Sequence, residues 1–415
     1  MMKQVSAYCK LFQPAVLEYI HGVRTFFMKI TDISTVVVNA RMRNWVFVKV
    51  QTDVPGLHGW GEATLEWKTR AVTGCVEDLK PMILGRDPTH IEFLWQILYR
   101  HSFFRPGIIG MTAISGIEQA CWDILGKSLG VPVYSLLGGK VRDKVRMYTH
   151  LGGGESKSVY ESFDSGPIID RALGVRDQGY TALKVVFVPY SRPLEGLPAV
   201  KHFAKLMGDL RAATGDDIDI MIDFHGRTTT GQAIQYIRAI EEFRPFFCEE
   251  PVPPENPDAL LEVRRSVNVP IASGERLVTR WEFRRMCELQ ACHVLQPDLN
   301  HCGGLMEAKK IAAMGETYFM GIAPHNPNGP VANAAALHFA LSTPNFLIQE
   351  DMLGDVPWRF DVVRTAMQRE AGYWLPLETP GLGIEIDEAE AAKHPFEQEH
   401  LQQMMFHEDG SVAEW

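Results

Sequence analysis

Two patterns of hydrophobic and polar positions divide the chain. In residues 28–64, short runs rich in β-branched side chains at 33–38 and 46–50 are separated by turn-forming residues, which predicts a small antiparallel sheet. Apolar residues then recur at three- and four-residue spacing within 114–124, which predicts a helix. We therefore expect residues 28–144 to form a first domain of the α+β class.

Residues 145–374 show a different pattern, in which short apolar runs alternate with amphipathic helical segments. Eight candidate strands stand out, at 146–151, 182–187, 218–222, 245–248, 270–273, 293–296, 318–323 and 346–349. Eight strand–helix units in this length predict a (β/α)₈-type barrel, with insertions at 152–166 and 188–200. We expect residues 375–415 to return and pack on the first domain, and we treat residues 1–27 as an N-terminal extension.

The composition of the chain excludes several classes of protein. The 415 residues are 46% hydrophobic, enough for a large core, and the net charge of −10 argues against binding to nucleic acid. No apolar run has the length that crosses a membrane, and we recognise no signal peptide. The seven cysteines are scattered and never spaced as CxxC, which is typical of a reducing compartment. We therefore expect a cytoplasmic protein with no membrane or nucleic-acid partner.

Three carboxylates follow successive predicted strands at equal spacing. Asp223, Glu249 and Glu275 are each 26 residues from the next, about the length of one strand, loop and helix. The carboxyl ends of barrel strands meet at one end, so these side chains should converge there. Carboxylates that converge without a cation between them repel one another, and all-oxygen ligation suits Mg²⁺. We therefore predict a Mg²⁺ site, with Glu249 as the ligand rather than Glu250, because successive strand residues face opposite ways.

Other polar residues at the predicted strand ends suggest acid–base chemistry. His225 lies two positions after Asp223 and should share its face of the strand. His325 ends the seventh strand and Asp298 the sixth, and an aspartate bonded to one imidazole nitrogen makes the other a better base. Strands three and seven are opposite in an eight-stranded barrel, so the two histidines should flank a substrate. Lys184 on the second strand either binds a substrate carboxylate or packs the barrel.

Motifs from residue 28 to the C-terminus resemble one known family. They are Asp223-Phe-His-Gly-Arg227, Glu249-Glu-Pro-Val, Gly274-Glu-Arg, Gln296-Pro-Asp-Leu-Asn-His-Cys-Gly-Gly304, Ala323-Pro-His-Asn-Pro, Gln349-Glu350, Pro380-Gly-Leu-Gly-Ile-Glu-Ile-Asp387 and the terminal His407-Glu-Asp-Gly-Ser-Val-Ala-Glu-Trp415. In these motifs the chain is similar to the enolase superfamily, in its mandelate racemase branch, and most similar to sugar-acid dehydratases of the galactonate type. The resemblance implies a barrel with an α+β capping domain that the C-terminal segment completes. It also implies a homo-oligomer, between a dimer and an octamer.

The resemblance also implies a role for individual residues. The Mg²⁺ ligands would be Asp223, Glu249 and Glu275. His225 would be the acid, and His325 would be the base, with Asp298 behind it. Glu350 would face the carboxylate of the substrate. Further substrate contacts would come from Lys184, Asn44 and Arg227.

The expected function is Mg²⁺-dependent dehydration of a galactonate-like aldonate. His325 would remove the C2 proton to give an enediolate, and His225 would protonate the departing 3-hydroxyl, giving a 2-keto-3-deoxy acid. Three alternatives stay open. The run Arg43-Asn44-Trp45 also resembles mannonate dehydratases, in which a loop tyrosine takes part, a role that Tyr190 could fill. The two histidines could instead pass a proton across C2, as in an epimerase or racemase. The third alternative, a barrel that only binds metal, would have little reason to keep both histidines.

Overall fold

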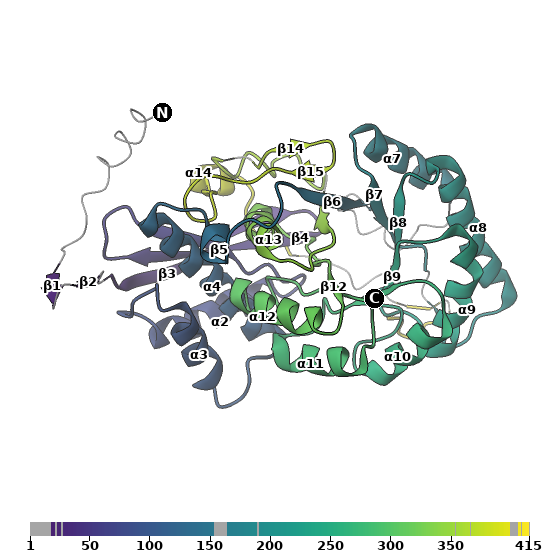
Figure 1. Cartoon of the computed structure of the whole chain (residues 1–415), viewed down its shortest axis with the longest axis horizontal. Coiled ribbons are helices and arrows are strands. Elements are labelled where there is room, and N and C mark those ends of the chain that lie inside the picture. The colour runs from purple at the N-terminus through teal and green to yellow at the C-terminus, as the bar shows by residue number, and fades with distance from the viewer. Residues whose placement is uncertain are drawn as a thin grey trace.

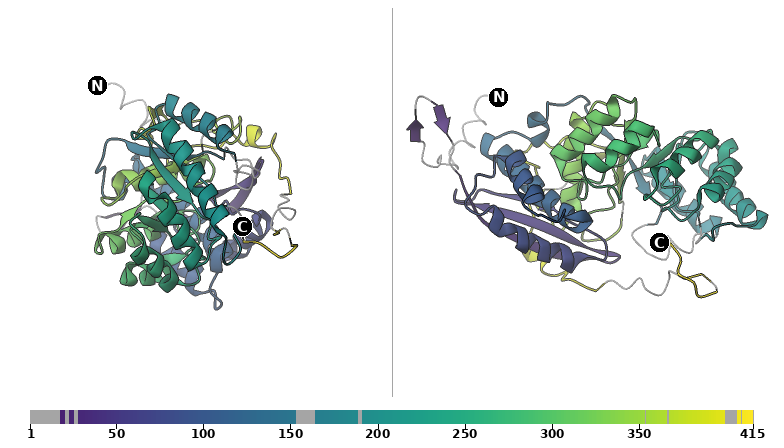
Figure 2. Two further views of the ribbon diagram at one scale, coloured as in Figure 1. Left: turned by 90° about the vertical axis from the view of Figure 1, so that its right-hand side faces the viewer. Right: turned by 90° about the horizontal axis from the view of Figure 1, so that it is seen from below.

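The computed structural model describes residues 18–20, 23–25, 28–152, 164–188, 191–352, 354–365, 367–398, 406–407 and 409–414. They form two parts side by side, a sheet covered by helices and a barrel ringed by helices (Figure 1). The C-terminal end lies beside the barrel (Figure 2). No helix within these ranges is long and apolar enough to cross a membrane, and the six cysteines they contain are all free thiols.

The first part is a three-stranded antiparallel sheet with helices packed on one face (Figure 2). Its strands are β3 (Ile30–Ala40), β4 (Arg43–Thr52) and β5 (His58–Glu62), with β4 in the centre. Its helices are α2 (Thr69–Leu79), η1 (Lys80–Met82), α3 (Ile91–Arg100), α4 (Gly107–Leu129) and α5 (Val133–Leu136). A short antiparallel pair, β1 (Glu18–Ile20) and β2 (Val23–Thr25), precedes the sheet. The α+β class expected for the first part is confirmed.

Helix α4 lies unusually close to strand β5, and glycine makes this possible. A Cβ atom at Gly61 would lie 1.9 Å from the carbonyl oxygen of Gly116 on the helix, so any larger residue would push the two elements apart. The close packing fixes the edge of the sheet against the helix whose other side faces the barrel.

Eight parallel strands form the barrel. They are β6 (Val145–His150), β7 (Ala182–Val185), β8 (Asp219–Asp223), β9 (Phe247–Glu249), β10 (Ile271–Ser273), β11 (Val294–Leu295), β12 (Gly321–Ile322) and β13 (Gln349–Asp351). Neighbours along the chain pair from β6 to β12, and β13 pairs with β6. Backbone hydrogen bonds of Ile322 with Asn345 and Leu347 join β12 to the residues just before β13. The eight strands predicted from the sequence are therefore all found, within a few residues of the expected positions.

Helices follow the first seven strands but not the eighth. They are α7 (Ser165–Asp177), α8 (Leu197–Thr214), α9 (Thr230–Ile240) with η2 (Glu241–Phe243), α10 (Pro257–Ser266), α11 (Thr279–Leu289), α12 (Leu305–Glu316) and α13 (Pro330–Ser342). After β13, the described residues 354–365 and 367–387 contain no helix. A hairpin of β14 (Arg369–Glu370) and β15 (Tyr373–Trp374) pairs with the start of β6 instead. The predicted barrel class is confirmed, in a form whose last unit has no helix.

The interior of the barrel is packed rather than hollow. One buried side chain from each strand or its immediate end forms an inner layer, made of Tyr148, Ala182, Met221, Phe247, Ala272, Val294, Ala323 and Ile348. Neighbouring side chains such as Ile220 and Ile222 belong to the main core between strands and helices. Side chains alternate along a strand, so the residue two positions after each inner one also points into the barrel, at its carboxyl end.

The segment after the barrel returns to the first part. The carbonyl group of His394 accepts a hydrogen bond from the backbone of Asn39, and the short helix α14 (Glu388–Ala391) packs beside β3. Farther along, residues 409–414 lie against barrel loops, where Glu414 is 3.9 Å from Arg276. The two parts of the molecule are thus joined by the C-terminal segment as well as by direct packing.

Candidate active site

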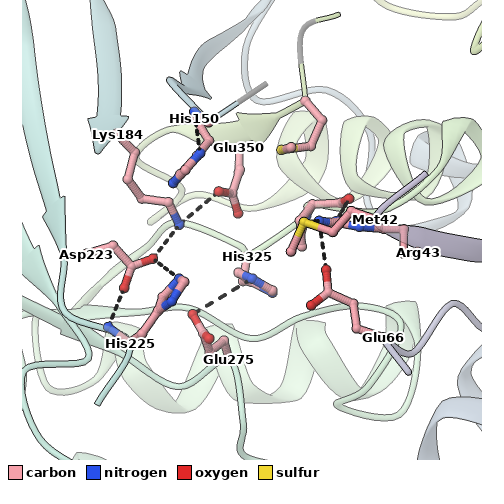
Figure 3. A pocket seen from close by; sticks show the side chains of 13 residues that line it. Met42, Arg43, Glu66, His150, Lys184, Asp223, His225, Glu275, His325 and Glu350 are labelled. Atoms are coloured by element: carbon pink, nitrogen blue, oxygen red, sulfur yellow. Dashed lines mark hydrogen bonds and ion pairs between the residues drawn. The ribbon is translucent and has the colours of Figure 1, made fainter. Parts of the chain in front are cut away.

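A pocket lies where the carboxyl ends of the barrel strands face the first part of the molecule (Figure 3). The first part contributes Met42, Arg43 and Glu66. The barrel contributes His150, Gly152, Lys184, Asp223, His225, Glu275, His325, Pro327, Glu350 and Met352. The pocket therefore brings together six of the residues predicted from sequence, which are Lys184, Asp223, His225, Glu275, His325 and Glu350.

Strand alternation explains why these side chains converge. Five of the lining residues, and Glu249 beside Lys184, lie two positions after a member of the inner layer, as the pairs Tyr148 and His150, Ala182 and Lys184, Met221 and Asp223, Phe247 and Glu249, Ala323 and His325, and Ile348 and Glu350 show. Glu275 differs, since it follows β10 after Gly274, whose φ of +134° is a conformation that favours glycine. Local backbone geometry therefore directs polar groups from six strand ends, and from the turns at His225 and Glu275, into one space.

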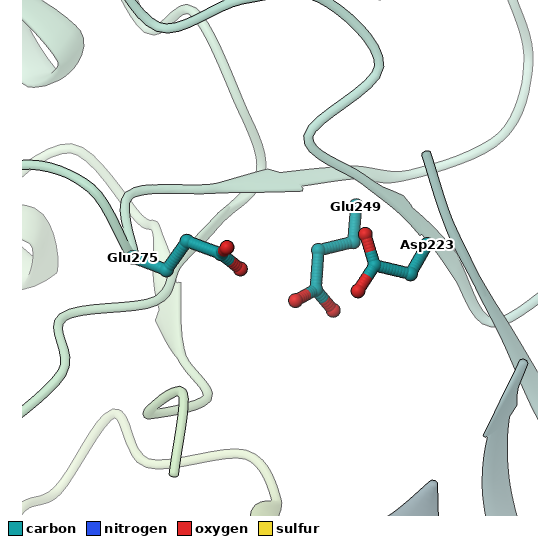
Figure 4. Close-up of side chains that lie close together, drawn as sticks. All are labelled: Asp223, Glu249 and Glu275. Carbon is teal, nitrogen blue, oxygen red and sulfur yellow. The ribbon is translucent and has the colours of Figure 1, made fainter. Parts of the chain in front are cut away.

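The three predicted metal ligands do lie together. One oxygen from each of Asp223, Glu249 and Glu275 can be chosen so that all three are within 4.8 Å of one another (Figure 4). Glu250 points elsewhere, because its carboxylate accepts hydrogen bonds from Ser273 and the backbone amide of Gly274. The three carboxylates form a group that could hold a metal ion.

Lys184 supplies a cation that the sequence argument did not include. Its ammonium nitrogen is 2.8 Å from Glu249, 2.8 Å from Glu350 and 3.3 Å from Asp223, and the residue is 2% exposed. Burial alone would lower the pKa of Lys184, but Glu249 and Glu350 outweigh it and raise that pKa well above its usual value. The lysine is therefore held protonated among the carboxylates, and the premise that they converge without a cation was wrong.

One lysine leaves the negative charge of this cluster incompletely balanced. The second oxygens of Glu249 and Glu275 are buried and make no hydrogen bond within the described part of the chain. Burial, together with the charges of Asp223 and Glu275, raises the pKa of Glu249 well above its usual range despite Lys184. Orphaned carboxylate oxygens that face one another are what an oxygen-preferring divalent cation requires. The donor set therefore fits such an ion.

His225 reaches Asp223 by a different route from the one expected. Strand β8 ends at Asp223, and His225 adopts a left-handed conformation with φ +50°. The turn places the Nε2 atom of His225 3.2 Å from Asp223 Oδ2. Although burial would raise the pKa of Asp223, His225 and Lys184 together hold it well below its usual value. His225 therefore lies beside Asp223 as expected, but a turn after the strand, and not the strand itself, brings it there.

His325 forms the expected pair with an aspartate. Its Nδ1 atom is 2.9 Å from Asp298 Oδ2, which also accepts a hydrogen bond from Asn328 at 3.0 Å. The Nε2 atom of His325 faces Glu275, 3.8 Å away. Burial would lower the pKa of His325, but Glu275 and the Asp298 hydrogen bond raise it to about 10. Asp298 thus fixes the orientation of the ring and directs Nε2 into the pocket.

Glu350 and His150 complete the wall of the pocket beside Lys184. Glu350 bonds Lys184 through one oxygen and accepts the backbone N–H of Asn326 through the other, at 2.8 Å. Burial would raise the pKa of Glu350, yet Lys184 and His325 lower it. His150 accepts the Gly152 backbone N–H at Nδ1, 2.8 Å away, so its neutral ring carries the hydrogen on Nε2. Burial lowers the pKa of His150 to about 3, so this ring stays neutral.

Comparison with known proteins identifies the family. Residues 23–138 match the N-terminal domain of mandelate racemase/muconate lactonizing enzymes, and residues 168–390 match the enolase C-terminal domain-like family. The chain belongs to the enolase superfamily. The resemblance inferred from the motifs is therefore confirmed.

Relatives within the superfamily include named enzymes and solved structures. The D-galactonate dehydratases of Ralstonia nicotianae and Cronobacter sakazakii are 39% and 38% identical over 94% of this chain and 100% of their own length. A mandelate racemase/muconate lactonizing enzyme-like protein from Roseovarius sp. TM1035 is 36% identical with a TM-score of 0.84, over 90% of this chain and 96% of its own. An enolase superfamily member from Salmonella Typhimurium is 34% identical with a TM-score of 0.82, over 89% of this chain and 99% of its own. The similarity to dehydratases identifies this superfamily member as an enzyme of the lyase class.

Two residues with predicted substrate contacts, Asn44 and Arg227, lie away from the lining of the pocket. Asn44 is buried and bonds the backbone of Glu397 through its side chain, at 2.8 Å and 3.1 Å. Arg227 is also buried, donates to the carbonyl of Val188 at 2.8 Å and lies beside His225. Tyr190 falls outside the described residues. Their parts in substrate binding stay predictions.

Among the lining residues with titratable or charged side chains, three were given no place in the pocket by sequence reasoning: Arg43, Glu66 and His150. His150 carried a usable signal, because it ends the first predicted strand just as Lys184 ends the second. Arg43 stood only in the run that resembles mannonate dehydratases, and Glu66 carried no signal, because the positions of both depend on how the first part docks onto the barrel.

Proposed function

We propose that the enzyme is a Mg²⁺-dependent dehydratase that converts a galactonate-like aldonate into a 2-keto-3-deoxy acid. One observation carries the proposal: His225 and His325 enter the same pocket from the third and seventh of eight barrel strands. Two histidines on opposite sides of a bound acid can remove and deliver a proton in separate steps. The D-galactonate dehydratase relatives support the choice of substrate class.

Asp223, Glu249 and Glu275 would hold the metal ion, because their facing oxygens fit an oxygen-preferring cation. When bound, Mg²⁺ supplies positive charge that fixes the substrate carboxylate, stabilises the enediolate and offsets the influence of Glu275 on His325. Lys184 adds a second fixed positive charge at the same end of the pocket, within 3.3 Å of three carboxylates. The acid end of the substrate would therefore bind at the barrel, beside Lys184.

His325 is the proposed base. Its Nδ1 atom bonds Asp298, so Nε2 is the atom that receives the proton from C2. Asp298 also stabilises the imidazolium that results, as carboxylates behind catalytic histidines generally do. Removal of the C2 proton leaves its bonding electrons in the enediolate of the substrate.

His225 is the proposed acid. The electron pair of the enediolate forms a double bond between C2 and C3 while the C3–O bond breaks, and the departing hydroxide takes a proton from His225. Water leaves, and the remaining enol tautomerises to the 2-keto-3-deoxy acid. Asp223 Oδ2 lies 3.2 Å from Nε2 of His225 and helps to hold the ring in the pocket.

The test is a screen of aldonic and aldaric acids with Mg²⁺, in which semicarbazide absorbance detects 2-keto-3-deoxy products. We expect turnover of a galactonate-like aldonate, and a loss of about a thousandfold or more in kcat for His325→Asn and for His225→Asn. His90→Asn, an exposed helix N-cap outside the pocket, is the matched control and should keep full activity.

Two results would overturn the proposal. Exchange of the C2 hydrogen in D₂O without any keto product would indicate epimerisation instead of dehydration. Neither exchange nor product with any sugar acid, in protein that binds Mg²⁺, would indicate a barrel that only binds metal.

A further inference from the structure

The pocket has a second charged end that the proposed mechanism does not use. Arg43, at the start of β4, and Glu66, after β5, face the barrel residues across the pocket (Figure 3). Within the described lining they are the two charged side chains that come from the first part of the molecule. Figure 3 places them on the far side of the pocket from Lys184 and Asp223, with His325 between the two groups.

Arg43 and Glu66 form an ion pair that is fixed in place. Arg43 Nη2 is 2.7 Å from Glu66 Oε1, and the side chains are 5% and 22% exposed. The Arg43 guanidinium also donates to the carbonyl of Pro327, in the loop that carries His325. A third acceptor is the Met42 sulfur, 3.5 Å from Nη2, so Arg43 is committed to acceptors of the protein itself and its charge is balanced before any ligand arrives.

A balanced pair of this kind recognises a particular chemistry. Hydroxyl groups both donate and accept hydrogen bonds, so they can bond to Glu66 and to the remaining donors of Arg43 at the same time. A second carboxylate could only accept, and it would lie against the negative charge of Glu66 in a largely buried site. Like charges placed together across an interface are strongly disfavoured, which is how binding sites reject wrong partners.

We propose that the Arg43–Glu66 pair recognises the terminal hydroxyl groups of the substrate and excludes a second carboxylate. The site would thus accept monocarboxylic aldonates and reject the corresponding dicarboxylic aldarates. The inference rests on the proposed function, because the acid group must sit at Lys184 for the opposite end of the chain to reach Arg43. It assigns the selection to two residues of the first part rather than to the barrel.

The test compares one aldonate with the aldarate of the same stereochemistry, galactonate with galactarate, in the Mg²⁺-loaded enzyme. In the wild type we expect kcat/KM for the aldonate to exceed that for the aldarate by about tenfold or more. Glu66→Gln removes the negative charge and leaves Arg43 able to pair with a second carboxylate, so the ratio should shift toward the aldarate by about tenfold or more. Asp32→Asn is the matched control, because Asp32 pairs with Lys80 in the first part but outside the pocket. This control should leave the ratio unchanged.

Binding measured by calorimetry gives a readout that does not depend on turnover. The catalytically inactive His325→Asn variant, with and without Glu66→Gln, is titrated with the same two acids in the presence of Mg²⁺. Preferential binding of the aldonate that Glu66→Gln weakens or reverses would support the inference. Equal or tighter binding of the aldarate to the protein with Glu66 would overturn it, even if dehydration proceeds as proposed. Tight, selective aldonate binding without turnover in the wild type would instead overturn the proposed function and leave the recognition role standing.

Discussion

Two groups of buried carboxylates in this enzyme have opposite surroundings. One region joins the first part to the barrel and the C-terminal segment. We call it the domain seam, and it consists of Glu62, Glu118, Asp123 and His338. The other region lies in the pocket and directly beneath it. We call it the barrel mouth, and it consists of Asp223, Glu249, Glu275, Glu350 and Lys184. Both regions bury acidic groups, yet only the first gives every carboxylate oxygen a fixed donor.

At the domain seam, Glu62 and Glu118 cap helices of the barrel. Glu62 accepts the backbone N–H groups of Gly329 and Ala332 at the start of α13, at 2.6 Å and 2.8 Å. Glu118 accepts those of Leu305 and Met306 at the start of α12, at 2.8 Å and 2.9 Å. The first N–H groups of a helix lack partners within the helix and carry partial positive charge. These carboxylates therefore stabilise the docking of the two parts.

At the barrel mouth, by contrast, Glu249 and Glu275 each leave a buried oxygen without a partner in the described part of the chain. Unsatisfied buried carboxylate oxygens cost stability. The comparison teaches that burial alone does not mark a functional acid. A functional acid is marked by carboxylates that converge and lack hydrogen-bond donors. These two features separate the proposed metal ligands from acids that only stabilise the fold.

The largest expected effect comes from Glu249→Gln. Loss of a proposed metal ligand should lower kcat by about a thousandfold or more at saturating Mg²⁺. Because the pKa of Glu249 is raised well above its usual range, its ionised form costs stability at neutral pH, and the neutral amide removes that cost. Steady-state kinetics and calorimetry of metal-free protein should therefore show lost activity without a lower Tm. A variant that loses several degrees of Tm would place Glu249 with the structural acids instead.

The next effect in size concerns Asp298, which belongs to the barrel but touches the base. Asp298→Asn should lower kcat by about a hundredfold or more, because the amide no longer fixes the tautomer of His325 or stabilises its charged form. KM for the aldonate should change by a much smaller factor. A kcat within threefold of the wild type would contradict the role of Asp298 behind the base.

Glu118→Gln tests the domain seam. Replacing one oxygen by an NH₂ group leaves backbone or Trp122 donors without an acceptor, so we expect a loss of about 1–3 kcal/mol in the free energy of unfolding. Activity per folded molecule should stay within about twofold of the wild type. Glu92→Gln, an exposed carboxylate paired with Lys310, is the control and should change stability by about 0.5 kcal/mol or less. Equal effects of the two variants would show that the helix caps contribute little.

His338 should produce a smaller effect, visible as pH dependence. Its Nδ1 accepts the Tyr134 backbone N–H and its Nε2 donates to the Leu382 carbonyl, so the ring must stay neutral. Burial lowers the pKa of His338 to about 4, below its unfolded value, so stability is lost as pH falls from about 6.5 toward 4. Between pH 7 and 5.5 the loss should be about 1 kcal/mol. Denaturant unfolding of His338→Gln should show a shallower slope over this range, and an unchanged slope would contradict the assignment.

Much of the fold followed from the sequence because it depends on local patterns. Period-two runs and strand–helix alternation located all eight barrel strands, and equal spacing located the three carboxylates. The absent eighth helix did not follow, since the chain after β13 pairs with β6 through β14 and β15, a long-range contact. The homo-oligomer implied by the resemblance stays a prediction.

The site was predictable only as far as strand ends determine it. The left-handed turn at His225 and the insertion of Lys184 among the carboxylates depend on side-chain packing, which a single sequence does not reveal. Arg43 and Glu66 lie more than 80 residues before the first strand end they face, and only the docking of the two parts places them there. Residues set by local geometry could thus be found, and residues set by tertiary packing could not.

The most direct test of the mechanism separates the two histidines. The aldonate with the best turnover is incubated in D₂O with Mg²⁺ and either His225→Asn or His325→Asn, and NMR follows both deuterium at C2 and the keto product. We predict that His225→Asn exchanges the C2 hydrogen while forming almost no product, because His325 still removes the proton. His325→Asn should do neither. Exchange that persists in His325→Asn and disappears in His225→Asn would contradict the assignment of base and acid.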